Sequence, residues 1–423
     1  SYLYRTLGTP THEKKGTVSH WIKRSAIGAN TEYGTFAAYN HGGGAADRGH
    51  LNIYDDTIYF YNQQTSTVLQ TNRKFRDTNA WYHIVIAWDT SQSTASNRVK
   101  IYVNGVQETS FSTANYPGQN NTMEFNVSGR RFTVGSKAGS GAADDFWDGY
   151  QSHFAFVDGL QLTPTSFGET DSTSGIWKFK SPSGVTWGNN GFHLKFENSG
   201  NLGLDSSGNG NNLTVAGNLK QALDTPSNVH ATWNKLDWGT TYFTLTDGNT
   251  TAQNNASVYT YGIATLGVNS GKFYWEVEYD ANNESNRFPM IGISSTQSTN
   301  STYELGHYPN DWCYYTNGST GKLRNNNSDI NWGTGYVEGD IIGVALDCTN
   351  NKLYFSKNGV WQESGDPSAG SNGISITAPS STPLGFYFPA ICYFDGTYRG
   401  TFKANFGNGF FGTTAITSAG SNG

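Results

Sequence analysis

Short segments in which apolar and polar residues alternate recur along the chain, and this two-residue period constrains the fold more than any other feature of the sequence. In residues 17–23 (TVSHWIK), Val18, His20 and Ile22 fall on one face of an extended strand and the other residues fall on the opposite face. Residues 81–88 and 99–103 predict further strands. Stretches rich in Ala, Leu, Glu and Lys, which long helices prefer, are almost absent.

Two hairpins can be placed from their turn residues. Asn104-Gly105 follows the strand at 99–103, and this dipeptide favours a tight hairpin because both of its residues accept positive φ. Residues 51–54 and 58–61 alternate on either side of Asp55-Asp56. Aspartate is a common turn residue, so we predict a second hairpin there.

The composition agrees with a chain of strands and excludes some partners. Glycine accounts for 51 of 423 residues, and charged and aromatic residues for 14% each, which suits short strands joined by turns. The net charge of −6 argues against nucleic acid as a partner, because binding phosphate needs a basic face. No apolar run approaches the roughly 18–20 residues of a membrane span, so we expect no membrane insertion. The chain is therefore predicted to be all-β.

The N-terminus and the cysteines lead to further expectations. Residues 1–5 (SYLYR) are polar and strand-like, so we expect no signal peptide, and a start at serine indicates a processed chain or an excerpt of a longer one. Cys313, Cys348 and Cys392 form an odd, sparse set, which is not a disulfide framework. They lie in alternating strand contexts, and we expect them to be buried as small apolar residues.

The first part of the chain resembles a known β-sandwich family. Residues 17–25 (TVSHWIKRS), the Trp-Tyr-His and Tyr-Val-Asn-Gly segments within 79–107, and residues 146–169 (FWDGYQSHFAFVDGLQLTPTSFGE) carry the resemblance. In this order they resemble the laminin-G/concanavalin-like jelly roll, over about residues 1–170. The resemblance implies the fold and does not select a function, because the same sandwich serves lectins, glucanases, adhesion modules and scaffolds.

Calcium is the cofactor to consider for this family. Members that bind Ca²⁺ use carboxylates and carbonyls of loops. In residues 141–150 (GAADDFWDGY), Asp144, Asp145 and Asp148 are candidate ligands, and a solvated acidic loop is the alternative. His41 and Asp47, in a glycine-rich loop, are weaker candidates.

Residues 171–235 differ in character from the segments on either side, with short apolar groups among Gly, Asn and Ser. We predict an ordered, strand-bearing connector, because its aromatic residues, Trp177 and Trp187 among them, need burial. Asp205 begins a segment, DSSGNGN, that resembles a motif of laminin-G-like proteins. The Asp205 carboxylate either chelates Ca²⁺ or satisfies the backbone of a tight loop.

The last part of the chain, residues 236–423, resembles a SPRY domain. Residues 271–280 (GKFYWEVEYD), 338–361 (EGDIIGVALDCTNNKLYFSKNGVW) and 386–394 (FYFPAICYF) follow the SPRY pattern in order. The resemblance extends over about residues 236–412 and implies a second β-sandwich.

A catalytic hypothesis arises from three carboxylates in this part. Glu276, Glu278 and Asp280 alternate, so they project from one face of a strand, and retaining glucanases on related sandwiches use such a row. The strand that carries them belongs to the SPRY pattern, which is non-catalytic. The order of its carboxylates, Glu-x-Glu-x-Asp, also differs from the glucanase order Glu-x-Asp-x-Glu. We find no Gly-x-Ser-x-Gly elbow, no phosphate-binding loop and no histidine spacing typical of a metal site. We therefore expect no enzyme.

Aromatic residues gather in residues 307–340, where we place a candidate recognition site. If they are exposed, these aromatic side chains stack on sugar rings or anchor a protein partner; they are Trp312, Tyr314, Tyr315 and Trp332. They fill the sandwich core if they are buried. The alternation around Cys313 indicates that one face of this strand is core, and the sequence leaves both alternatives open.

The whole arrangement resembles virion proteins of tailed phages of marine bacteria, in which segments like residues 158–169, 203–215 and 223–234 lie between or beside the two domains. The resemblance implies two jelly-roll-like antiparallel sandwiches in tandem on a virion surface, as a tail fibre, appendage or capsid-surface component. It also implies a homo-oligomer, other virion proteins as partners, and attachment to host-surface polysaccharide. The alternative is a carbohydrate-binding lectin or adhesin, with or without Ca²⁺, and a glycoside hydrolase comes last.

Overall fold

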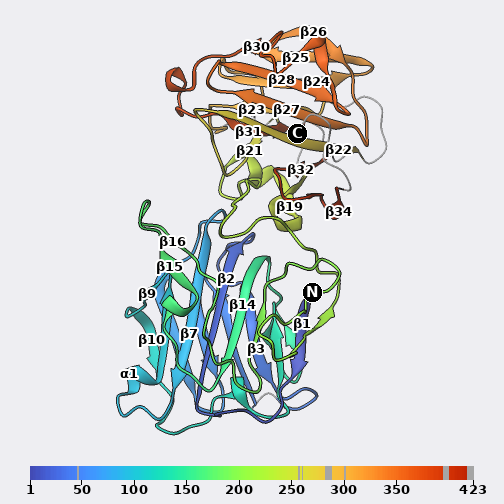
Figure 1. Cartoon of the computed structure of the whole chain (residues 1–423). Helices are drawn as coiled ribbons and strands as arrows, with labels where there is room; N and C mark the ends of the chain where they lie inside the picture. The colour runs from blue at the N-terminus through green and yellow to red at the C-terminus, as the bar shows by residue number, and fades with distance from the viewer. Residues whose placement is uncertain are drawn as a thin grey trace. The chain divides into compact units, whose positions relative to one another are not determined.

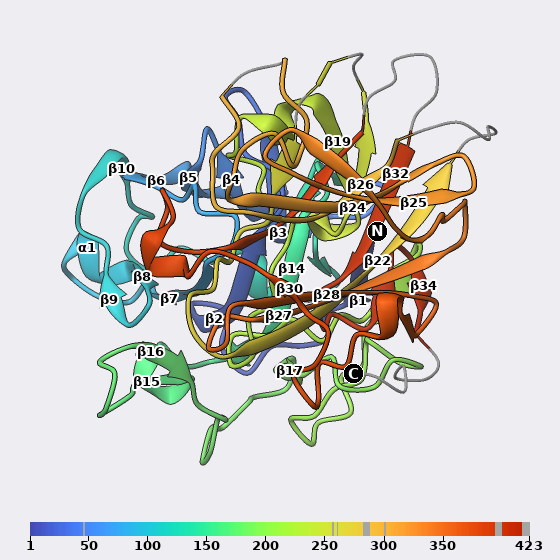
Figure 2. The same cartoon turned by 90° about the horizontal axis from the view of Figure 1, so that it is seen from above.

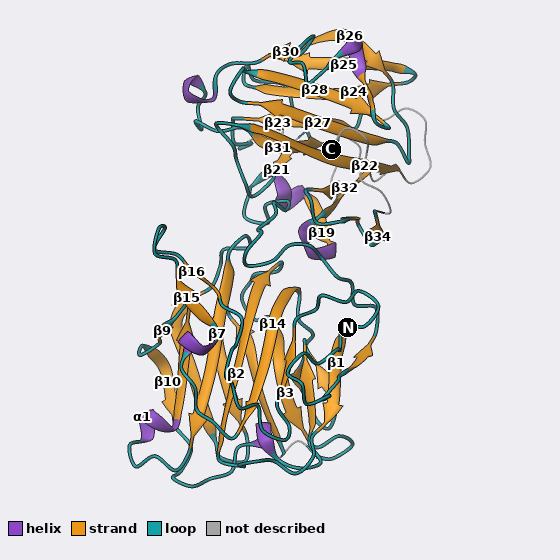
Figure 3. Ribbon diagram, viewed as in Figure 1, coloured by secondary structure: helices purple, strands orange, loops and turns teal. Residues whose placement is uncertain are grey.

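The computed structural model describes residues 1–44, 47–255, 258–259, 261–281, 288–299, 302–393 and 400–416. Its contacts divide the chain into two compact units. Unit 1 comprises Ser1–Gln221 and Thr225–Asn228, and unit 2 comprises Ala222–Asp224 and Val229–Gly423. Strands form nearly all of the regular structure in the described residues (Figures 1 and 3). The all-β prediction is confirmed.

Unit 1 contains two antiparallel sheets that face each other. Sheet A has the strand order β10-β6-β5-β4-β3-β11-β1-β18. Its strands, in chain order, are β1 (Tyr2–Thr6), β3 (Glu32–Tyr39), β4 (Arg48–Tyr54), β5 (Thr57–Asn62), β6 (Thr67–Lys74), β10 (Phe111–Asn115), β11 (Arg131–Val134) and β18 (Thr214–Ala216). The hairpin of β4 and β5 has the predicted turn, since Asp55 and Asp56 both adopt positive φ.

Sheet B has the order β17-β14-β2-β7-β8-β9. Its strands are β2 (Lys15–Arg24), β7 (Trp81–Asp89), β8 (Val99–Val103), β9 (Val106–Gln107), β14 (Gly149–Asp158) and β17 (Phe192–Leu194). The short helix α1 (Ala95–Arg98) lies beside β8 (Figure 2). The predicted turn at Asn104-Gly105 joins β8 to β9, with φ of 48° and 82°.

The core of unit 1 fills the space between the two sheets. Val18, His20 and Ile22 of β2 are fully buried, as their alternation predicts, and His20 packs against aromatic rings. Trp88 at the end of β7 lies directly on Gly16, where a Cβ atom would come within 2.3 Å of the indole. Two 3-10 turns, η1 (Glu124–Asn126) and η2 (Pro164–Ser166), complete the unit together with the hairpin β12 (Lys137–Ala138) and β13 (Ala143–Asp144).

Residues 171–221, which the sequence analysis assigns to a connector, contribute strands to unit 1. β17 pairs with β14 in sheet B, and β18 pairs with β1 in sheet A. The hairpin of β15 (Gly168–Thr170) and β16 (Trp177–Phe179) packs on sheet B, where Trp177 Nε1 donates to His83 Nδ1 at 2.9 Å. Trp177 and Trp187 were expected to be buried, and both are half-buried.

Unit 2 is also a pair of antiparallel sheets. Sheet C has the order β19-β20-β32-β22-β27-β28-β29, with β30 beside β28, and sheet D has the order β21-β31-β23-β24-β25-β26. Sheet C is built from β19 (Phe243–Thr246), β20 (Thr251–Asn254), β22 (Lys272–Ala281), β27 (Ile341–Asp347), β28 (Lys352–Lys357), β29 (Val360–Trp361), β30 (Ile374–Ser375) and β32 (Gly400–Asn405). Sheet D is built from β21 (Tyr261–Ile263), β23 (Met290–Ser294), β24 (Asp311–Asn317), β25 (Thr320–Asn325), β26 (Ser328–Thr334) and β31 (Phe388–Cys392). The remaining elements are η3 (Gly239–Tyr242), η4 (Asp247–Asn249), η5 (Gln362–Ser364), η6 (Pro379–Ser381), β33 (Phe410–Phe411) and β34 (Thr414–Ala415).

The three cysteines lie inside unit 2. Cys313 on β24 and Cys392 on β31 are fully buried, and Cys348 is 6% exposed. These three residues, all within the described part of the chain, form no disulfide. Their expected role as small buried residues is confirmed.

Two of the carboxyl groups that are buried in unit 2 have raised pKa values. Asp311 on β24 is fully buried and Asp237 is 2% exposed. Asp311 accepts hydrogen bonds from Ser294 Oγ at 2.7 Å and Tyr261 OH at 3.1 Å. Burial raises the pKa of each carboxyl from the ordinary value of 3.8 to about 6, although the hydrogen bonds oppose this rise.

We expect Asp311→Asn to make the stability of unit 2 less dependent on pH. The folded pKa lies above the unfolded value, so the stabilising contribution of the proton is present below about pH 4 and lost as pH rises through about 6. A shift of this size corresponds to about 2–3 kcal/mol in the free energy of unfolding. Asparagine keeps an acceptor oxygen and does not ionise. Urea unfolding at pH 5 and pH 7.5, followed by pulsed hydrogen exchange of residues 290–317, measures the effect.

Asp366, a half-buried residue in a local surface turn, provides the control for this experiment. Asp366→Asn should leave the difference between the two pH values as it is in the unaltered protein. An Asp311→Asn protein with the same pH dependence as the unaltered chain would contradict the assignment of a raised pKa to Asp311.

Candidate functional site

Three tyrosine rings lie next to one another on the outer face of sheet A. They belong to Tyr54 of β4 and to Tyr59 and Tyr61 of β5, and we call them the tyrosine platform. The ring centroids of Tyr54 and Tyr59 are 6.0 Å apart, and those of Tyr59 and Tyr61 are 6.2 Å apart with planes inclined by 20°. All three residues are half-buried. They face outward because the residues that alternate with them, Ile53, Ile58 and Phe60, are fully buried in the core.

Two buried polar side chains lie beside the platform on the same face of β4. In the strand register His50 is opposite Tyr61 and Asn52 is opposite Tyr59. His50 is 5% exposed and Asn52 is 1% exposed, yet within the described residues His50 Nδ1 and Asn52 Oδ1 have no hydrogen-bond partner. Burial, assisted by nearby cations, lowers the pKa of His50 to about 3, so this imidazole is neutral at pH 7. Buried polar atoms left in this state are positions where an ordered water is expected.

Charged side chains form a polar rim next to the platform. Lys137 of the β12–β13 hairpin pairs with Asp145 at 2.5 Å and with Glu32. Asn52 Nδ2 donates to Glu32 Oε2 at 3.3 Å. The hairpin crosses β3 at Gly34, where a Cβ atom would come within 1.8 Å of the Lys137 backbone nitrogen. Only glycine permits this close crossing, which brings Lys137 to the platform.

The chemistry of this face suits a polyhydroxylated ligand. Half-exposed phenol rings present flat apolar surfaces at low cost in side-chain entropy, and their hydroxyl groups are available for hydrogen bonds. Burial raises the pKa of Tyr59, so its phenol stays protonated at neutral pH. The imidazole, amide and charged groups around the rings add donors and acceptors, as expected where sugar hydroxyls must be satisfied.

The aromatic residues predicted for recognition lie elsewhere. Tyr314 is fully buried and Tyr315 is 5% exposed. Trp312 and Trp332 are half-buried and pack against the core of unit 2. A buried ring offers no free face to a sugar, so the burial of these two tyrosines favours the core alternative. Alternation around Cys313 already pointed to this result.

The aspartates predicted to bind Ca²⁺ do not converge. Asp144 is exposed, and its carboxylate accepts from the backbone nitrogen of Asp145 at 2.9 Å. Asp145 is paired with Lys137, and Asp148 is exposed at the start of β14. In the described part of the chain, no group of three or more His, Cys, Asp or Glu side chains is arranged to hold a metal ion. The acidic-loop alternative is therefore the one that this arrangement favours.

Asp205 organises its own loop. Its carboxylate accepts from the backbone nitrogens of His193 at 2.9 Å, Ser207 at 2.8 Å and Asn211 at 2.8 Å. Ser207 Oγ donates to it as well, at 2.8 Å. These hydrogen bonds occupy both carboxylate oxygens, as in an Asx turn. The loop interpretation of the DSSGNGN segment is thus supported over the calcium interpretation.

The carboxylate row of β22 lies on the outer face of sheet C and is internally paired. Glu276 accepts from Tyr274 OH at 2.8 Å and from Asn405 Nδ2 at 3.2 Å. Glu278 and Asp280 both bind Lys403, at 3.0 and 2.7 Å. The row is therefore part of the pairing between β22 and β32.

A buried serine–histidine pair in sheet B was not foreseen from the sequence. Ser19 Oγ lies 2.8 Å from His83 Nε2, and Trp177 Nε1 donates to His83 Nδ1. An indole N–H is only a donor, so the neutral imidazole must carry its proton on Nε2 and donate to Ser19. Burial lowers the pKa of His83 to about 3. The proton is placed opposite to that of a catalytic pair, in which the histidine accepts from the serine.

Both units are antiparallel β-sandwiches, and unit 1 has an outward aromatic face. Residues 4–166 match the Concanavalin A-like lectin/glucanases superfamily, and residues 272–407 match the SPRY domain. The chain therefore carries a concanavalin-like domain and a SPRY domain in tandem. Together they support a binding or adhesin-like role.

Several solved structures resemble parts of the chain. They include the PSpry domain of TRIM65 (15% identity, 41% of this chain and 87% of that chain, TM-score 0.29). The SPRY domain of human HERC1 is similar at 16% identity, over 40% of this chain and 90% of that chain, with a TM-score of 0.27. A native heptameric SAP-like pentraxin from Limulus polyphemus is similar at 16% identity, over 38% of this chain and 71% of that chain, with a TM-score of 0.30.

None of the helices in the described ranges is long and apolar enough to cross a membrane.

Proposed function

We propose that this chain is a non-enzymatic attachment protein of a virion surface and that it binds host-surface polysaccharide through the tyrosine platform. The tandem of a concanavalin-like and a SPRY domain supports binding. The virion location rests on the resemblance of the whole chain to phage structural proteins. The glycan part rests on one observation, the row of Tyr54, Tyr59 and Tyr61 beside the unpartnered polar atoms of His50 and Asn52.

We expect the double substitution Tyr59→Ala with Tyr61→Ala to weaken glycan binding about 30- to 1000-fold, because truncating each of the two stacked aromatic anchors costs on the order of 1–2 kcal/mol. Both side chains point away from the core, so unit 1 should stay folded. The measurement is a glycan array with the purified chain, followed by titration of the best polysaccharide fragment by calorimetry.

Tyr4→Ala is the matched control. Tyr4 is a half-buried tyrosine on the outer face of the same sheet, on β1, under the guanidinium of Arg131 at 4.5 Å. This variant should bind as the unaltered chain does. An unaltered chain that binds no glycan on the array and no candidate host cell would overturn the proposed function.

Calcium dependence separates the proposal from the lectin alternative. The platform offers rings, an imidazole and an amide, so we expect EDTA to leave glycan binding unchanged. Binding that is saturable with Ca²⁺ and lost with EDTA would instead favour a calcium-dependent adhesin and return attention to the aspartate loops.

Assembly and the absence of catalysis are further parts of the proposal. Homo-oligomers and contacts with other virion proteins follow from the phage resemblance, and a monomer by light scattering at micromolar concentration would count against them. Incubation of the bound polysaccharide with the chain should release no new reducing ends. Release of reducing ends that depends on Glu276 would instead indicate a glycoside hydrolase.

A further inference from the structure

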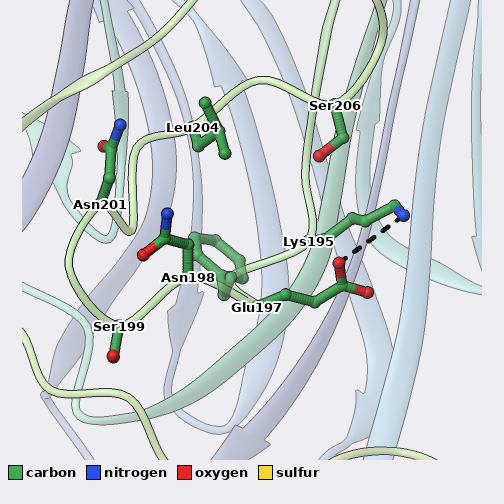
Figure 4. Close-up of a pocket in the computed structure, with 8 residues that line it drawn as sticks. Lys195, Glu197, Asn198, Ser199, Asn201, Leu204 and Ser206 are labelled. Carbon is green, nitrogen blue, oxygen red and sulfur yellow. Dashed lines mark ion pairs between the residues drawn. The ribbon is translucent and has the colours of Figure 1, made fainter.

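A pocket of about 340 Å³ lies in unit 1, in the loop that follows β17. Figure 4 shows polar side chains from this single loop around the hollow, with Lys195 and Glu197 paired at 3.7 Å and Asn201 and Ser206 on other parts of its wall. The volume is at the lower end of the range for small-molecule sites. This pocket is separate from the tyrosine platform, because its lining comes entirely from residues 195–206.

The same segment contains two kinds of polar side chain. Asn209 and Asn211, together with Asp205, use their side chains to hold the loop backbone: both amides donate to Gly191 O, at 2.9 and 2.8 Å. These bonds make the frame of the pocket rigid. Loops held in this way can present a preformed site.

The polar side chains that line the pocket do not hold the loop backbone by hydrogen bonds. Within the described residues, the side chains of Ser199, Asn201 and Ser206 make no hydrogen bond. The contrast with Asn209 and Asn211 shows that the loop does not need these groups to hold its shape. They are available to a ligand.

Backbone conformation at the pocket is unusual. Phe196, which lines it, has a φ of 60°. Positive φ is rare for a bulky aromatic residue and marks positions where the surrounding structure maintains strain, often at ligand sites. Gln221 Nε2 donates to Phe196 O at 2.6 Å and holds this conformation. The ring of Phe196 and the side chain of Leu204, which is 40% exposed, add apolar surface to the polar wall.

We propose that this pocket binds one uncharged sugar residue of a glycan, independently of the tyrosine platform. Its only charged lining groups, Lys195 and Glu197, neutralise each other, which disfavours an ionic ligand. Uncommitted amides and hydroxyls suit a polyhydroxylated ring, and Leu204 and Phe196 suit its C–H face. The inference goes beyond the proposed function, since it adds a second site.

Saturation-transfer difference NMR of the full chain tests this site with methyl glycosides of glucose, galactose, mannose and N-acetylglucosamine at millimolar concentration. Methyl glucuronide is the charged probe. We expect a saturable signal from at least one neutral glycoside. Asn201→Ala with Ser206→Ala should raise its Kd at least fivefold, because both lost groups are uncommitted in the free protein.

Asn218→Ala with Ser183→Ala is the matched control, since it removes one amide and one hydroxyl from exposed positions outside the pocket. It should leave the Kd unchanged, and so should Tyr59→Ala with Tyr61→Ala. Three results would each overturn the inference: no signal from any neutral glycoside, a signal from the glucuronide alone, or a signal lost with the platform and kept without Asn201 and Ser206. The last result leaves the proposed function intact. If the pocket binds a neutral glycoside but the chain binds no polysaccharide on the array, only the proposal for the platform is refuted.

Discussion

Replacing Asp158 by alanine is expected to lower the free energy of unfolding of unit 1 by about 4 kcal/mol, because it leaves two buried and two partly buried donors without this acceptor. Asp158 ends β14 and is 1% exposed. Its carboxylate accepts from the backbone nitrogens of Thr11 at 2.7 Å, His12 at 3.2 Å and Asn190 at 3.0 Å. Asn126 Nδ2 donates to it at 2.5 Å.

These partners come from parts of the chain that are far apart in sequence. Asn190 lies in the segment just before β17, while Thr11 and His12 precede β2. One carboxylate thus ties the returning segment to the beginning of the domain. Without it, the segment that carries β17 should separate from sheet B at low denaturant concentration.

Chemical denaturation followed by circular dichroism measures the loss, and hydrogen exchange of residues 187–194 locates it. Asp171→Ala is the matched control: Asp171 also accepts from backbone nitrogens, of Thr173 and Ser174, but in an exposed local turn. It should leave the midpoint of unfolding essentially unchanged. Equal effects of the two substitutions would show that Asp158 does not have this role.

Trp233→Ala is expected to destabilise unit 2 by about 3–5 kcal/mol, the usual effect of truncating a fully buried large aromatic side chain. Trp233 is fully buried, and its ring packs edge-to-face on Phe406 at 5.2 Å. The indole nitrogen donates to Thr250 O at 3.1 Å. The substitution therefore creates a cavity and also removes one of the two hydrogen bonds that Thr250 O accepts, the other coming from the backbone nitrogen of Ala404 at 2.9 Å.

The control for this substitution lies five residues further on. Trp238 is half-buried and packs edge-to-face on Tyr242 at 5.2 Å. Trp238→Ala should cost about 1 kcal/mol or less, because solvent already reaches this side chain. Thermal unfolding of both variants, with unit 2 followed by hydrogen exchange of residues 341–357, provides the comparison. A loss at Trp233 no larger than at Trp238 would contradict the role of Trp233 as a core residue of unit 2.

Both predictions concern residues whose role depends on the segment 171–235. Asn190 and β17 belong to unit 1, and Trp233 belongs to the core of unit 2. The composition of this segment, with short apolar groups among Gly, Asn and Ser, is typical of a connector. Its contacts depend on partners such as β1 and β14, which lie far away in the sequence, and local composition carries no information on such pairing.

Strand positions, turns and buried faces could be predicted from the sequence because each depends on neighbours within a few residues. The alternation of Val18, His20 and Ile22 predicted a shared face, and Asn104-Gly105 predicted a hairpin turn. The alternation in residues 51–61 also places the three tyrosines of the platform on one face of the hairpin. With Ile53, Ile58 and Phe60 taken as core, Tyr54, Tyr59 and Tyr61 must face outward, and the two strands of a hairpin bring them together.

Only the tertiary structure decided which aromatic residues are available to a ligand and which polar groups are already used. Trp312, Tyr314, Tyr315 and Trp332 look like a recognition loop in the sequence, yet they pack in or against the core of unit 2. Asp205 looks like a calcium ligand, yet backbone donors occupy its oxygens. Side-chain alternation sets the face of a strand, whereas burial of that face and competition for hydrogen bonds depend on segments distant in the chain. For that reason the sequence by itself determined the class of fold, and long-range packing determined which aromatic and polar side chains are left exposed or unpaired.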